Sequence, residues 1–123
     1  MRDDQLLAGK HILIVEDEML VLMAIEDMMS DLGAESVTAA AKVEQALKLI
    51  SARHFDFATL DINLDGVRSD PVANALGADS VPFAFSTGYG NHLVEGAHGE
   101  QPILRKPYNR TNLTQIVNQM FPG

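Results

Sequence analysis

The chain has 123 residues, and its 9 lysines and arginines against 17 aspartates and glutamates give a formal net charge of −8. This is the size of one ordinary domain, and the acidity argues against general binding to nucleic acid or to an anionic membrane. The absence of cysteine excludes disulfides and thiolate chemistry, while 46% apolar residues suffice for a core. No apolar run approaches the roughly 20 residues of a membrane span, and the acidic start lacks a signal-peptide layout. We therefore expect a cytoplasmic protein that does not enter membranes.

Short apolar runs alternate along the chain with stretches of helical periodicity. Strands are predicted over 12–15, 36–38, 55–62, 81–86 and 103–104, and helices over 18–32, 43–50, 70–77 and from 109 onward. This alternation predicts an α/β fold with a doubly wound, five-stranded parallel sheet in the flavodoxin-like order 2-1-3-4-5. We expect one domain over residues 10–123, preceded by a flexible lead-in over 1–9.

Several helix boundaries and faces can be predicted from single residues. Asp70 is expected to cap the third helix ahead of Pro71, and Asn109 to cap the last one. In the first helix, helical spacing predicts a buried stripe of Val21, Ile25, Met28 and Leu32. The stretch 88–101 holds four of the nine glycines, so any fourth helix is expected to be short or disordered.

Charged and hydroxyl side chains follow the predicted strands at the points where they end. Because the carboxyl ends of parallel strands share one edge of a sheet, these side chains are expected to converge where the strand order reverses. They are Glu16, Asp17, Asp61, Thr87 and Lys106. Clustered carboxylates need a cation, and hard oxygen ligands in a wet cleft suit Mg²⁺. A hydroxyl and an ammonium group nearby can hold a phosphoryl group, which a free carboxylate could accept as an aspartyl phosphate.

These motifs, in this order, resemble the receiver domain of two-component response regulators over residues 10–121. The resemblance rests on Val15-Glu16-Asp17-Glu18, Asp61, Thr87-Gly88 and Lys106-Pro107. The run 82–90, Pro-Phe-Ala-Phe-Ser-Thr-Gly-Tyr-Gly, is similar to the signature of the atypical "FAT GUY" receivers, with Ser86 in place of the alanine. Those receivers are often single-domain proteins with a degenerate fourth helix.

The resemblance implies a role for each motif residue. Asp61 would accept the phosphoryl group from a sensor histidine kinase or a phosphotransfer protein, and Thr87 and Lys106 would contact that group. Asp17 and Asp61 would bind Mg²⁺, with Glu16 acting through water and the backbone carbonyl of Asn63 completing the shell. Such a protein is a phosphoacceptor that dephosphorylates itself rather than an enzyme with a separate substrate, and it signals by protein contact or serves as a phosphate sink.

The first helix carries more apolar side chains than contact with a sheet requires. Met19, Leu20, Leu22, Met23 and Met29 all lie outside the predicted stripe. They could widen the core face, or they could form a docking surface for the kinase or phosphotransfer partner, as is common in receivers.

The sequence departs from the common receiver pattern at two places, and one rival function stays open. The aromatic residue usual on the last strand would fall at Ile103, and the loop after Asp61 lacks the usual Met-Pro. We therefore hypothesise that phosphorylation orders the segment 88–101 through Thr87.

The rival function is that of a small phosphohydrolase of the aspartyl-phosphate type. The position of the general acid in such an enzyme, two residues after the nucleophile, is held here by Asn63, which cannot exchange a proton.

Overall fold

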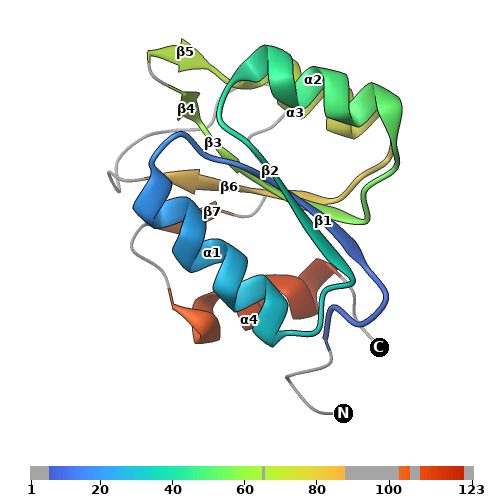
Figure 1. Ribbon diagram of the computed structural model, residues 1–123, viewed down its shortest axis with the longest axis vertical. Coiled ribbons are helices and arrows are strands. Elements are labelled where there is room, and N and C mark those ends of the chain that lie inside the picture. The colour runs from blue at the N-terminus through green and yellow to red at the C-terminus, as the bar shows by residue number, and fades with distance from the viewer. Residues whose placement is uncertain (1–5, 65, 88–102, 106–108, 121–123) are drawn as a thin grey trace.

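The computed structural model describes residues 6–64, 66–87, 103–105 and 109–120, which form a parallel sheet with helices on both faces (Figure 1). The sheet has five strands in the order β2-β1-β3-β6-β7. Their bounds are His11–Val15 for β1, Ser36–Ala40 for β2, Phe57–Asp61 for β3, Phe83–Thr87 for β6 and Ile103–Arg105 for β7. Counted in chain order within this sheet, the strands follow 2-1-3-4-5, so the predicted topology is confirmed.

Among the described residues, four helices cover the sheet, with α1 and α4 on one face and α2 and α3 on the other (Figure 1). They span Met19–Asp31 (α1), Val43–Ala52 (α2), Asp70–Ala78 (α3) and Arg110–Met120 (α4). None of the helices in the described ranges is long and apolar enough to span a bilayer. The short or disordered helix expected within 88–101 lies outside the described residues.

Each face of the sheet has its own hydrophobic core, because side chains alternate between the two faces along every strand. Leu13, Leu60 and Phe85 pack under α2 and α3, whereas Ile12 and Phe57 pack under α1 and α4. β1 is therefore apolar on both faces from Ile12 to Val15, as its continuous apolar run predicts.

Two of the four residues predicted for the buried stripe of α1 are replaced by the next residue along the chain. Leu22, Ile25 and Met29 are buried in the helix, and Leu32 follows them into the core. Val21 and Met28 are only partly buried. Nearly every residue in the amino-terminal half of α1 is apolar, so periodicity alone allows two neighbouring stripes, and packing on the sheet selects one of them.

Residues 6–9, predicted as part of a flexible lead-in, pack against the end of α1. Leu7 is fully buried in the core under α1 and α4, and its backbone N–H donates to the carbonyl of Leu32 at 2.8 Å. Ala8 forms an antiparallel bridge with Ala34. Residues 1–5 lie outside the described residues.

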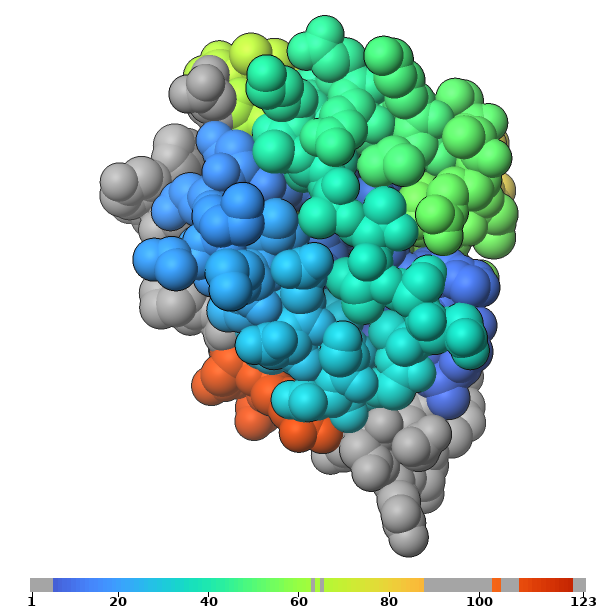
Figure 2. Space-filling view, in the orientation of Figure 1, coloured from blue at the N-terminus to red at the C-terminus, as the bar shows by residue number. Residues whose placement is uncertain are grey.

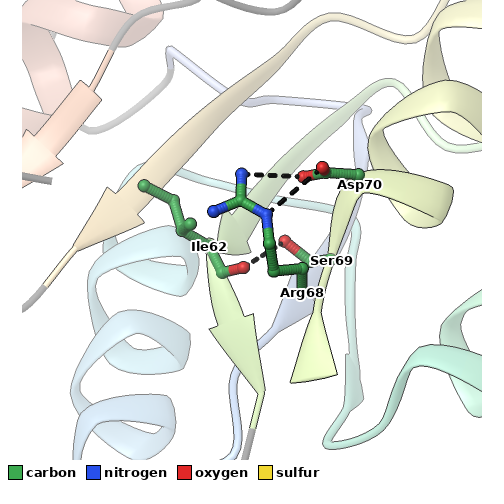
Figure 3. Close-up of polar contacts among 4 residues, drawn as sticks. All are labelled: Ile62, Arg68, Ser69 and Asp70. Carbon is green, nitrogen blue, oxygen red and sulfur yellow. Dashed lines mark hydrogen bonds and ion pairs between the residues drawn. The ribbon is translucent and has the colours of Figure 1, made fainter. Parts of the chain in front are cut away.

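A short antiparallel hairpin stands between β3 and α3, where only a loop was expected (Figure 1). It consists of β4 (Asn63–Leu64) and β5 (Val67–Arg68), and Gly66 in its turn has a φ of 85°, which favours glycine. At the hairpin's base, both the backbone N–H and the hydroxyl of Ser69 donate to the carbonyl of Ile62 at 3.0 Å (Figure 3). These bonds close the segment that follows Asp61 into a fixed loop.

The start of α3 corrects one predicted cap, and the start of α4 confirms the other. Ser69, not Asp70, occupies the N-cap position of α3, but its buried hydroxyl donates to the carbonyl of Ile62 and makes no cap hydrogen bond. Asp70 lies in the first turn, where it accepts two hydrogen bonds from Arg68 at 3.2 and 3.3 Å (Figure 3). At α4, Asn109 and Asn112 cap each other reciprocally at 2.8 and 3.0 Å.

Candidate functional site

Three carboxylates meet at the carboxyl edge of the sheet. Each of Glu16, Asp17 and Asp61 contributes an oxygen, and these oxygens all lie within 4.8 Å of one another. Glu16 and Asp17 directly follow β1, and Asp61 is the last residue of the neighbouring strand β3. The parallel pairing of two adjacent strands therefore brings together residues that lie 44 and 45 positions apart in the sequence.

Backbone hydrogen bonds fix this edge just beyond the ends of the strands. The N–H of Glu16 donates to the carbonyl of Ala40 at 2.9 Å, which extends the β1–β2 ladder by one residue. The N–H of Ile62 donates to the carbonyl of Ser86 at 3.3 Å and extends the β3–β6 pairing in the same way. The N–H of Glu18 donates to Oε2 of Glu16 at 3.2 Å, so the Glu16 side chain is held at the start of α1.

The burial of the three carboxylates makes the cluster suitable for a hard cation. Glu16 is 1% exposed and Asp61 7% exposed, whereas Asp17 is exposed to solvent. Ionised carboxylates this close repel one another, and the repulsion is strongest where water is excluded. A Mg²⁺ ion would relieve it, because Mg²⁺ takes a few carboxylate oxygens and retains several waters, for which the exposed side of Asp17 leaves access. The donor set therefore fits this metal.

Of the remaining predicted site residues, Thr87 lies at the same edge of the sheet as the three carboxylates. Asn63 is placed by its backbone pairing, and Lys106 falls outside the described residues. Thr87 is buried at the end of β6, one residue beyond Ser86, which pairs with Asp61. Asn63 begins β4, two residues after Asp61, and its backbone pairs with Arg68. Lys106 lies outside the described residues; the strand before it, β7, ends at Arg105, which pairs with Thr87.

A groove of about 520 Å³ adjoins the acidic cluster between the hairpin and the start of α2. Its lining includes Asp17 on one side, Lys42 and Glu44 at the start of α2, and Leu64 and Val67 of the hairpin. The β4–β5 hairpin that lines this groove was not predicted from the sequence. The signal was present in Asp65-Gly66, because an Asp-Gly pair in a two-residue connection is typical of tight β-hairpins.

Comparison with known proteins decides the family. The family model of the response regulator receiver domain matches residues 12–118, which includes the sheet from Ile12 onward and all four described helices up to Asn118. The chain belongs to the response regulator receiver domain family. The family expected from the order of the motifs is therefore confirmed.

This receiver domain is similar to two structures of SdrG and to the regulator PhyR. The solution structure of SdrG from Sphingomonas melonis Fr1 is 37% identical, covers 88% of this chain and 92% of its own, and superposes with a TM-score of 0.80. The BeF₃-activated conformation of SdrG, from Pseudomonas melonis Fr1, is 35% identical over 92% of this chain and 97% of its own, with a TM-score of 0.78. The phyllosphere-induced regulator PhyR of Methylorubrum extorquens is 31% identical over 89% of this chain, which spans only 42% of PhyR.

Proposed function

We propose that this receiver domain is the phosphoacceptor of a two-component system and that Asp61 carries the phosphoryl group. The observation that carries the proposal is the cluster of three carboxylate oxygens within 4.8 Å at the carboxyl edge of the sheet. Membership of the receiver family and the likeness to SdrG, which has a BeF₃-activated conformation, support it.

Glu16, Asp17 and Asp61 would hold Mg²⁺, together with the backbone carbonyl of Asn63. Bound there, the ion would offset the negative charge that the carboxylates and an incoming phosphoryl group bring together. Glu16 is nearly fully buried and its Oε2 accepts the N–H of Glu18, so we expect it to act through a bound water rather than as a direct ligand.

In the proposed transfer, an oxygen of the Asp61 carboxylate attacks the phosphorus of a phosphohistidine on the partner protein. The new P–O bond forms as the P–N bond breaks, and the electron pair of that bond leaves with the imidazole nitrogen. Water later attacks the phosphorus, and the bond between the phosphorus and the Asp61 oxygen breaks. Inorganic phosphate leaves, and the Asp61 carboxylate is restored. The chain would thus act as a signalling protein with self-dephosphorylation, not as an enzyme with a separate substrate.

Thr87 and Lys106 would bind the phosphoryl oxygens opposite the carboxylates. The hydroxyl of Thr87 can donate one hydrogen bond, and the ammonium group of Lys106 supplies a compensating positive charge. The position of Thr87 at the end of β6, one residue beyond the partner of Asp61, supports its part of this role.

The exposed surface of α1 is the proposed docking surface for the histidine kinase or phosphotransfer protein. Met19, Leu20 and Met23 are 65%, 83% and 52% exposed, and they follow the acidic cluster directly in the chain. Figure 2 shows the outer surface of α1, in blue, open on the visible face of the molecule. Leu22 and Met29, by contrast, belong to the core. Flexible methionine side chains next to a phosphoacceptor suit a partner that must bring its phosphohistidine close.

Acetyl phosphate provides a direct test of the proposal without a kinase. With Mg²⁺, we expect intact-mass spectrometry to detect one added phosphoryl group, stable in acid and labile in base. The adduct should be absent without Mg²⁺ and absent in Asp61→Asn, which keeps the size of the side chain but removes the nucleophilic oxygen. Persistence of the adduct in Asp61→Asn would place the phosphoryl group elsewhere and refute the proposal.

Incubation with small phosphate esters in place of acetyl phosphate separates the phosphoacceptor from the rival phosphohydrolase. A phosphoacceptor releases only the phosphate that it has itself accepted, whereas a hydrolase turns over many equivalents of small phosphate esters. Steady turnover of such esters would therefore favour the hydrolase.

Whether the phosphorylated protein signals by contact or drains phosphate calls for a second measurement. A phosphate sink would lower the phosphorylation of another receiver that shares its kinase, and Asp61→Asn would lose this effect. A contact signal would instead require a partner that binds the phosphorylated form more tightly than the free form.

A further inference from the structure

Two buried hydroxyl groups lie on the sheet close to Asp61 and have no role in the site described above. Thr59 and Ser86 are each 1% exposed. Within the described part of the chain, neither Oγ1 of Thr59 nor Oγ of Ser86 has a hydrogen-bond partner. Leaving a buried hydroxyl without a partner destabilises the folded protein, and an apolar side chain of similar size would avoid that cost. Such a group in a folded protein therefore calls for an explanation.

The strand register places both hydroxyls relative to Asp61. Asp61 of β3 pairs with Ser86 of β6, and Thr59 pairs with Ala84. Paired residues of neighbouring strands share a face of the sheet, as do alternate residues along one strand. Ala84 belongs to the core under α1 and α4, so Thr59, Asp61 and Ser86 all lie on this face. Ser86 is the lateral neighbour of Asp61, and Thr59 lies one row deeper.

We propose that Ser86 is a positioning residue whose hydroxyl gains its hydrogen-bond acceptor when Asp61 is phosphorylated. This inference rests on the proposed function. In the free protein, the carboxylate of Asp61 is grouped with Glu16 and Asp17. Phosphorylation adds three oxygens to the Asp61 side chain, directly beside Ser86. The serine hydroxyl can turn among its staggered rotamers without moving the backbone and can donate to one of these oxygens.

The consequence is a preference for the phosphorylated state that is built into the free protein. The unpartnered hydroxyl destabilises the unphosphorylated form, and its hydrogen bond to a charged acceptor stabilises the phosphorylated form. Thr59 does not share this property, because it lies a row further from the carboxyl edge, with Asp61 between it and the phosphoryl group. Thr59 therefore provides a matched control.

The test compares wild type, Ser86→Ala and Thr59→Val by unfolding and by titration with beryllofluoride in the presence of Mg²⁺. Without ligand, both variants should be at least as stable as wild type, because each loses a buried hydroxyl that has no partner. Wild type and Thr59→Val should bind beryllofluoride equally well. Ser86→Ala should bind it about fivefold to tenfold more weakly, which at 1.4 kcal/mol per factor of ten is about 1.0–1.4 kcal/mol.

Each outcome bears on a separate claim. Equal beryllofluoride affinity of Ser86→Ala and wild type would overturn the inference, as would a clear loss of stability in Ser86→Ala without ligand, since the hydroxyl would then already have a partner. Weakening of the same size in Thr59→Val would show a general effect of the core rather than positioning by Ser86. Failure of wild type itself to bind beryllofluoride would instead refute the proposed function.

Discussion

Asp17 differs from the other two carboxylates of the cluster because its side chain is exposed. It is therefore the carboxylate through which a hydrated Mg²⁺ can enter the site. We expect Asp17→Asn to weaken Mg²⁺ binding by about tenfold to a hundredfold or more. A loss of that size follows even when a residue that only hydrogen-bonds a metal ligand is replaced. Isothermal titration with MgCl₂ measures this change directly.

The matched control is Asp79→Asn, which changes the net charge by the same amount. Asp79 is exposed and follows the end of α3, so it lies away from the carboxyl edge of the sheet. Its Mg²⁺ affinity should equal that of wild type. Equal weakening in both variants would mean that the overall negative charge attracts the ion, and the acidic cluster would then not be a specific site.

The location of the site could be predicted at the level of single residues because the topology leaves little choice. Once β1 and β3 are neighbours in a parallel sheet, Glu16, Asp17 and Asp61 must meet at its edge. The burial of Ser86 also follows from strand alternation. Its lack of a hydrogen-bond partner could not be predicted, because that depends on every donor and acceptor around the hydroxyl, most of them distant in the sequence.

The exposed amino-terminal half of α1 gives a prediction at the scale of an element. Leu20 is the most exposed of its apolar residues, so a charge there should not disturb the core. We expect Leu20→Arg to slow phosphotransfer from the cognate kinase by at least about tenfold, the effect of losing one central contact of an interface. Phosphorylation by acetyl phosphate should be unchanged, because that small donor needs no docking surface.

Ala52→Arg provides the control for Leu20→Arg, because it adds the same charge at an exposed position at the end of α2, on the opposite face of the sheet. It should leave both reactions at wild-type rates. If Leu20→Arg impaired the reaction with acetyl phosphate as well, the substitution would have damaged the phosphoacceptor site, and docking on α1 would have no support from the experiment.

The elements themselves were predictable where local chemistry and packing favour the same answer. The continuous apolar run of β1 and the reciprocal cap of α4 are such cases. The prediction was wrong where neighbouring residues both suit one position. Ser69 and Asp70 are both of a type that caps helices. Ser69 takes the N-cap position of α3, although its hydroxyl donates to the carbonyl of Ile62 and makes no cap hydrogen bond. The expectation that any helix in 88–101 is short or disordered stays a prediction.

At the scale of the whole molecule, the net charge of −8 and the acidic cluster predict different responses to salt. Screening by any salt lowers the general repulsion among surface charges. Mg²⁺ that binds a specific site adds a term by mass action, because the unfolded chain lacks the site. The two contributions can be separated by comparing MgCl₂ with NaCl at equal ionic strength.

We expect MgCl₂ to stabilise the protein beyond NaCl, and the excess should depend on the acidic cluster. At a free Mg²⁺ concentration about 100 times the dissociation constant, one site adds about 2.7 kcal/mol to the free energy of unfolding. Urea unfolding at matched ionic strength measures this excess. Asp17→Asn should lose most of it at the same MgCl₂ concentration, and EDTA should return wild type to its stability in NaCl. Equal stabilisation by both salts would leave charge screening as the whole effect and would contradict a metal site between β1 and β3.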